Sequence, residues 1–182
     1  DSIERNKQML RDSADMQIYQ NLGGDLVVRV INQSGHKLPT GYGEGRRMWL
    51  NVKFYDSGGG MLAERGAYDY GTADLTTGDT TVYELKHGID AVQATASGKP
   101  VGESFHFVLN NEILLDNRIP PRGFDLSDFT AVQAEPVNYT YLENHHWDEV
   151  EYVIPAGTHN LEVNLYHQTT TKEYIEFLRD CL

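Results

Sequence analysis

The residues with the clearest chemical character lie in one loop, residues 35–47, with the sequence GHKLPTGYGEGRR. His36 is the single histidine of this loop, and a neutral imidazole is a common metal ligand. Four glycines permit unusual backbone angles and Pro39 removes a backbone donor, so we expect the loop to have one fixed shape. Such a loop can present His36 as a ligand. Alternatively, His36 only closes the loop by a hydrogen bond, while Arg46 and Arg47 pair with carboxylates.

The other motifs do not predict catalysis. The seven histidines form no HExxH pattern, and His145 and His146 would point to opposite sides of an extended chain. The sequence lacks a GxSxG elbow and a phosphate-binding glycine loop, and no nucleophile, base and orienting group can be placed together. LSDF and LLDN offer oxygen ligands for calcium, although neither belongs to an EF-hand loop. We therefore predict that the chain is not an enzyme.

Charge and cysteine content exclude several classes of protein. Twenty-seven acidic and fifteen basic residues give a net charge of −12, which opposes binding to nucleic acid or to anionic lipid. Cys181 is the sole cysteine, so the chain has no intrachain disulfide, CxxC zinc site or CxxCH haem attachment. No apolar run approaches the roughly 20 residues of a membrane span. The chain begins at Asp1 rather than Met, which predicts a processed product or a piece of a longer protein.

Hydrophobic periodicity predicts a mainly β fold with a short helix at each end. Amphipathic spacing indicates a helix over residues 3–16, and residues 171–182 are expected to form a closing helix. Many short strands without alternating helices favour an antiparallel β-sandwich. The expected strands are 25–31, 48–55, 61–70, 81–86, 104–110, 113–116, 150–154 and 161–167. Residues 1–22 would then be an N-terminal helix and linker, and residues 23–182 a sandwich domain closed by the C-terminal helix.

Period-two spacing also predicts the core and one connection. The expected core residues are Leu26, Val28, Val30, Leu50, Val52, Phe54, Phe107, Leu109, Leu161, Val163 and Leu165. Residues 116–124, DNRIPPRGF, are expected to be a fixed connection rather than a strand interior, because Pro120 and Pro121 cannot donate to a ladder. Arg118 and Arg122 would extend from this connection toward neighbouring carboxylates.

Four stretches resemble a known family. They are INQSGHKLPTGYGEGRRMWLNVKFYD, GESFHFVLNNEILLDNRIPPRGF, HHWDEVEYVIPAG and LYHQTTTKEYIEFLRD. Together, and in the same order from about Arg5 to Arg179, they resemble the C-terminal β-rich domain that follows the haem-binding part of certain bacterial multihaem c-type cytochromes. In that family a GHxxPTG loop followed by an Arg-Arg strand recurs. This sequence departs from the family in having no CxxCH motif.

The resemblance implies a non-catalytic accessory or docking role in electron transport outside the cytoplasm, whether periplasmic, cell-surface or extracellular. Haem c would come from another part of the protein or from another chain, with none bound covalently here. His36 would be the first candidate for a distal axial ligand, and Arg118 and Arg122 could contact haem propionates. The implied partner is a haem-bearing domain or neighbouring subunit, with no nucleic acid and no membrane span. The alternative is a structural or binding subunit of an extracellular filament or surface assembly, without a redox role.

Overall fold

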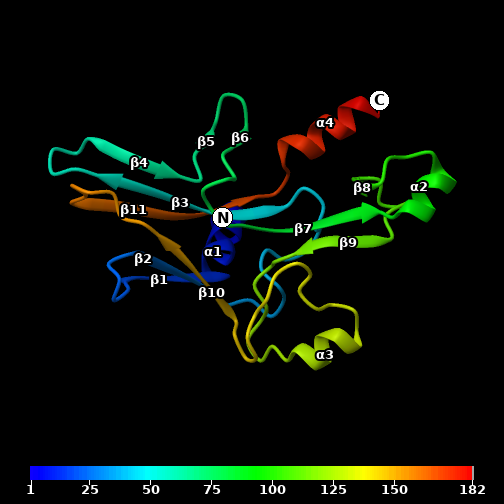
Figure 1. Cartoon of the computed structure of the whole chain (residues 1–182), viewed down its shortest axis with the longest axis horizontal. Helices are drawn as coiled ribbons and strands as arrows, with labels where there is room; N and C mark the ends of the chain where they lie inside the picture. The colour runs from blue at the N-terminus through cyan, green and yellow to red at the C-terminus, as the bar shows by residue number, and fades with distance from the viewer. Residues whose placement is uncertain (182) are drawn as a thin grey trace.

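Two antiparallel sheets form the body of the protein in the computed structural model, which describes residues 1–181 (Figure 1). The first sheet has the order β1 (Ala14–Gln20), β2 (Leu26–Asn32) and β10 (Trp147–Tyr152). β2 is central because it pairs with both β1 and β10, and five of its seven residues are buried, as expected for a strand covered on both sides.

The second sheet has the order β11 (Asn160–Gln168), β3 (Arg47–Tyr55), β7 (Val82–Ile89) and β8 (Gly102–Glu103). β4 (Met61–Arg65) also pairs with β3, and β9 (Glu112–Asp116) pairs with β7. A small hairpin, β5 (Tyr68–Asp69) and β6 (Asp74–Leu75), lies apart from this ladder. All pairings between these strands are antiparallel, so the prediction of a mainly β, antiparallel fold is confirmed.

The core lies between the two sheets and is largely the predicted one. Six expected residues are fully buried there: Leu26, Val28, Val30, Leu50, Val52 and Phe54. Val163 and Leu165 pack against this cluster and are half-buried, whereas Leu161 is exposed. The last three residues lie on β11, whose place at the edge of its sheet leaves it less covered than β3.

The predicted strand over 104–110 is wrong, and with it the core assignments of Phe107 and Leu109. This segment bends instead, with backbone hydrogen bonds from Phe107 to Phe105 and from Leu109 to His106. Phe107 is 37% exposed and Leu109 half-buried. The apolar run faces the C-terminal helix rather than the core, since the ring of Phe105 lies 5.2 Å from that of Tyr174.

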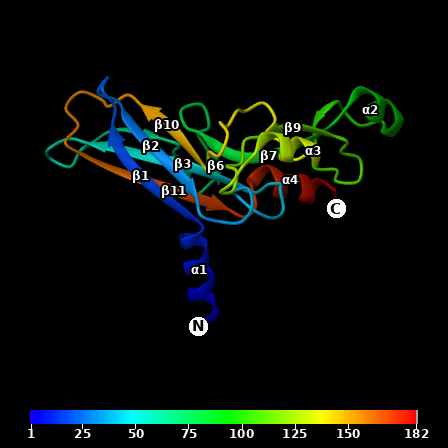
Figure 2. The ribbon, with the colours of Figure 1, turned by 90° about the horizontal axis from the view of Figure 1, so that it is seen from below.

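Four helices accompany the sheets: α1 (Ser2–Asp12), α2 (Ala91–Ser97), α3 (Leu126–Ala131) and α4 (Lys172–Asp180). The predicted terminal helices are α1 and α4, but the helix expected over 3–16 is too long. Residues 14–20 form β1, which pairs with β2 along its whole length. α1 buries none of its residues and projects from the body (Figure 2). Within residues 1–181, no helix is long and apolar enough to cross a membrane.

Candidate functional site

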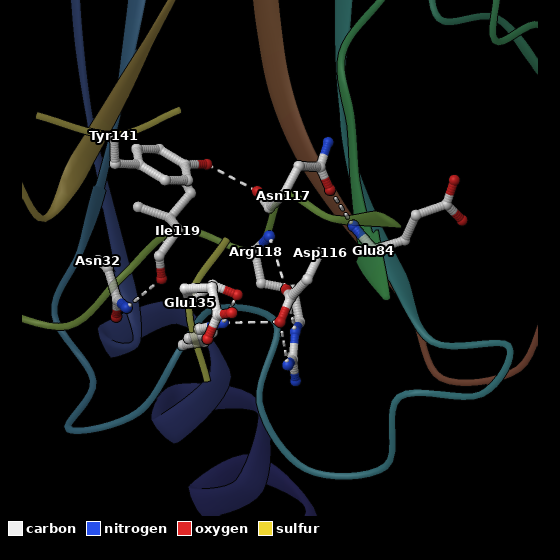
Figure 3. A network of polar contacts seen from close by, with 9 residues as sticks. Asn32, Glu84, Asp116, Asn117, Arg118, Ile119, Glu135 and Tyr141 are labelled. Carbon is white, nitrogen blue, oxygen red and sulfur yellow. Dashed lines mark hydrogen bonds and ion pairs between the residues drawn. The ribbon is translucent and has the colours of Figure 1, made fainter. Parts of the chain in front are cut away.

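The backbone of the His36 loop is held by a buried amide at the end of β2. Asn32 Nδ2 lies 2.7 Å from the carbonyl oxygen of His36, 2.9 Å from that of Ile119 and 3.0 Å from that of Pro120. Its Oδ1 accepts hydrogen bonds of 2.8 Å from the backbone N–H and the hydroxyl of Ser34. Figure 3 shows this side chain directed at Ile119. One fully buried residue therefore ties β2, the loop and the 116–124 connection together.

A pair of backbone hydrogen bonds fixes the same junction. Leu38 and Ile119 each donate to the other's carbonyl at 2.8 Å, forming an isolated antiparallel bridge. Pro120 and Pro121 follow outside any strand, which confirms the prediction of a connection at 116–124. Because Ile119 and Leu38 are both buried, this bridge anchors the loop to the core at Leu38, directly after Lys37.

A buried ion network, formed by Lys37, Asp116 and Arg118, supports the loop next to His36, and Figure 3 shows Asp116 beside Arg118. Lys37 Nζ lies 2.7 Å from Asp116 Oδ2, and Arg118 donates to both carboxylate oxygens, at 2.8 and 2.7 Å. The side chains of Lys37 and Asp116 are only 8% and 3% exposed. Burial alone would raise the pKa of Asp116, but Arg118 and Lys37 outweigh it and lower that pKa. Burial lowers the pKa of Lys37, opposed by its carboxylate partner.

The far end of the loop is held by Arg46, whose Nη1 donates to the carbonyl of Thr40 at 2.7 Å. Gly41 has a φ of +80°, and a Cβ there would lie 2.4 Å from the Arg46 guanidinium. A residue with a side chain would be strained at this φ and would displace the Arg46 guanidinium, so glycine is favoured at this position. Arg47 instead donates to Gln168 and lies 3.7 Å from a carboxylate oxygen of Glu173.

The His36 imidazole is exposed and makes no hydrogen bond to any residue in 1–181, although its own carbonyl is bound. The alternative in which His36 closes the loop through its side chain is therefore not found in this part of the chain. His36 lines two hollows, one largely apolar of about 700 Å³ and one more polar of about 560 Å³. Such a side chain has a nitrogen free to bind a metal ion brought by another group.

The predicted site residues are only partly brought together. Arg118 lines the more polar hollow with His36, whereas Arg122 is exposed and contacts Gln33 at 3.4 Å. Among residues 1–181, no group of three His, Cys, Asp or Glu side chains is placed to hold a metal ion. His36 can therefore supply one ligand but does not form part of such a cluster.

Three acidic or amide residues in or just before the two motifs considered for calcium make structural contacts. In LLDN, Asp116 belongs to the ion network, and Asn117 donates to Val82 and accepts from the backbone N–H of Glu84. In front of LSDF, Asp125 accepts from the N–H groups of Ser127 and Asp128 and caps α3. These contacts account for Asp116, Asn117 and Asp125, whereas the carboxylate of Asp128, within LSDF itself, makes no hydrogen bond among residues 1–181.

Sequence reasoning missed Asn32, Lys37 and Asp116 as supports of the site. Asn32 does carry a signal, because an amide ends a strand that is otherwise almost entirely aliphatic, LVVRVIN. Lys37 and Asp116 are separated by 79 positions, and nothing in a sequence with 27 acidic residues marks this pair.

These observations define a class of protein with two antiparallel sheets and a hydrogen-bonded loop on which the His36 side chain is exposed. No family model and no curated protein matches the sequence. Among solved structures, the chain is similar to a penta-heme cytochrome c552 from Thermochromatium tepidum, with a TM-score of 0.50 and 17% identity. The match covers 97% of this chain and 37% of that chain. At this identity the likeness shows a shared fold, and our chain spans little more than a third of the cytochrome's length.

Proposed function

We propose that this chain is a non-catalytic accessory or docking domain of a multihaem electron-transfer protein located outside the cytoplasm. One observation carries the proposal. Nearly the whole chain shares its fold with part of a penta-heme cytochrome, while its His36 is presented with an unbonded imidazole on a fixed loop. The absence of CxxCH means that the haem would be attached to another part of the protein or to another chain.

The residues around His36 fit a haem ligand. Haem iron accepts imidazole nitrogen, and bound haem would supply the electron-carrying iron. Metal-binding histidines need a defined orientation. Here Asn32 holds the peptide of His36, and the buried contacts of Lys37 hold the next residue. Arg118 is 17% exposed and pairs with Asp116 through its Nε–H and one Nη2–H, so its other N–H groups remain as donors for a propionate. Arg122 is exposed, and among residues 1–181 its side chain bonds to Gln33.

His36→Ala in the haem-bearing protein is expected to change the absorption spectrum and reduction potential of one haem, because that iron loses an imidazole ligand. The fold should remain intact, since the side chain makes no hydrogen bond within residues 1–181. Redox titration followed by absorbance, with circular dichroism for the fold, measures both. His159→Ala, an exposed histidine at the start of β11, is the matched control.

The haem content of the protein isolated from its source tests the electron-transfer proposal itself. Its Soret absorbance and iron content should show haem in stoichiometric amount. A native protein without haem would reject the electron-transfer proposal, and an unchanged haem spectrum in His36→Ala would reject the ligand.

A second candidate function, a subunit of a surface assembly, is favoured by the edge strand β11. It pairs with β3 over nine residues without a register shift, and its outer edge has no strand partner among the described residues. It has no proline, lysine or arginine and a single acidic residue, Glu162. Native edge strands usually carry charges, bulges or prolines that prevent pairing with another chain.

Asn164→Lys tests this candidate, because a lysine at the middle of β11 would disfavour pairing with a strand of another molecule. If β11 mediates assembly, size-exclusion chromatography with light scattering should show large species for the wild type and monomers for the variant. Gly78→Lys, at an exposed turn position with open space around it, is the control. A monomeric wild type at high concentration would reject self-assembly through β11.

A further inference from the structure

A largely apolar hollow lies beside His36, between the base of α1, the His36 loop and β11. We call it the α1 hollow. Its apolar lining comes mainly from Met9, Leu10, Met16, Leu38, Met48 and Leu165. Its volume of about 700 Å³ lies within the roughly 300–1,000 Å³ typical of small-molecule and cofactor sites. β1 and β11 are edge strands of the two sheets, and both contribute to its walls, so the hollow is the open side of the sandwich.

α1 lacks a partner that would account for its stability. It projects from the body, and Ile3, Met9 and Leu10 are 61%, 65% and 48% exposed (Figure 2). An isolated helix of 11 residues is marginally stable in water, and most helices gain their stability by packing an apolar face. Met9 and Leu10 also line the α1 hollow, so a group bound there would cover these two exposed apolar side chains.

The charge of α1 differs in sign from that of the chain. Ser2–Asp12 contains three basic and two acidic residues, Arg5, Lys7 and Arg11 against Glu4 and Asp12, so its net charge is 3 − 2 = +1. The whole chain carries −12. Of the three basic residues of α1, Arg11 lines the hollow itself, beside the acidic Asp15 of β1, while Arg5 and Lys7 lie further along α1. A covering group with an apolar body and anionic substituents would be complementary to this surface.

We propose that the α1 hollow receives the face of a haem carried by another polypeptide segment, with His36 directed at its iron and the basic residues of α1 facing its propionates. This inference rests on the proposed function and specifies which side of His36 the haem occupies. The more polar hollow on the other side contains the Lys37–Asp116–Arg118 network, whose charges already neutralise one another in part. An apolar porphyrin face is better matched by thioether and aliphatic side chains.

The probe is a c-type haem on a short CxxCH peptide, which supplies one axial histidine and leaves the sixth position open. Titrated with the full 182-residue chain, it should change from a high-spin to a low-spin absorption spectrum at micromolar concentrations. His36→Ala should abolish this change. Leu10→Asp should weaken binding about tenfold, because it places a charge in the apolar wall. Leu22→Asp, at a fully exposed position away from the hollow, and His159→Ala should bind within about twofold of the wild type.

Each outcome decides the inference. Loss of affinity in both His36→Ala and Leu10→Asp, with circular dichroism unchanged, would support it. An effect of His36→Ala without an effect of Leu10→Asp would overturn the α1 hollow but retain His36 as a ligand approached from its other side. Equal or tighter binding of free protoporphyrin iron would overturn the assignment to a polypeptide-borne haem. No spectral change with the wild type would overturn the inference, whereas the haem content of the native protein tests the proposed function separately.

Discussion

Asp116→Asn is expected to lower the free energy of unfolding at pH 7 by about 3–5 kcal/mol, the usual effect of breaking a buried ion pair. Lys37 and Arg118 would both lose their carboxylate, and Lys37 is 8% exposed, so its ammonium could not recover full hydration. The amide keeps the size of the carboxylate but not its charge. Urea unfolding followed by circular dichroism measures the change.

Asp148→Asn is the matched control, since Asp148 is a half-buried carboxylate with different partners. Tyr83 and Tyr139 both donate to its Oδ2, at 2.9 and 2.8 Å. Burial raises the pKa of Asp148 despite these bonds. An asparagine oxygen can accept both hydrogen bonds without the cost of a buried charge. Stability at pH 7 should therefore be unchanged or higher, and an equal loss in both variants would show that the ion network has no special role.

The pH dependence of stability separates the two carboxylates further. The pKa of Asp116 is lower in the folded than in the unfolded protein, so ionised Asp116 stabilises the fold above about pH 4 and loses this effect as the pH falls through its folded pKa. The pKa of Asp148 is higher in the folded protein, so its contribution to stability falls as the pH rises from about 4 through its folded pKa. Unfolding should be measured between about pH 2.5 and 7. In Asp116→Asn the free energy of unfolding should fall less steeply as the pH is lowered below about 4. In Asp148→Asn the fall in the free energy of unfolding that Asp148 causes above about pH 4 should disappear.

The strands with both faces covered could be predicted from sequence, whereas two segments at the margins could not. β2 and β3 have β-branched, aliphatic and aromatic residues whose burial follows directly from pairing. The helix predicted over 3–16 includes residues 14–16, yet backbone pairing with β2 makes them the start of a strand. In residues 104–110 the apolar alternation is real, but Phe105 and Phe107 face the aromatic residues of α4. Periodicity records which residues are apolar and not which surface covers them.

The candidate site, too, could be predicted from the sequence only in part. The shape of residues 35–47 could be predicted in outline from glycine and proline, and Gly41 does have a positive φ. The contacts that fix the loop come from Asn32, Asp116 and Ile119, and two of these lie about 80 positions away. Such long-range pairs depend on how the 116–124 connection crosses the end of β2, which a single sequence does not encode as a local pattern.

Asn32→Asp is expected to reduce the free energy of unfolding by about 3 kcal/mol or more, although the two side chains have nearly the same shape. The substitution replaces a donor with an acceptor in front of the carbonyl oxygens of His36, Ile119 and Pro120, all within 3.0 Å of Nδ2. Buried acceptors that lose their donor cost roughly 1–3 kcal/mol each, and a buried carboxylate facing them adds repulsion.

Ser34→Ala provides the contrast for this prediction, because it removes one hydroxyl and leaves the Asn32 amide in place. We expect it to cost less than about 1 kcal/mol. The haem-peptide titration then distinguishes a loss of stability from a loss of the fixed position of His36. Under conditions where Asn32→Asp remains folded, a loose His36 peptide should weaken haem-peptide binding, because an unfixed ligand must be ordered when it binds. If Asn32→Asp lowers stability but leaves haem-peptide affinity unchanged, Asn32 supports the β2 junction and does not position His36.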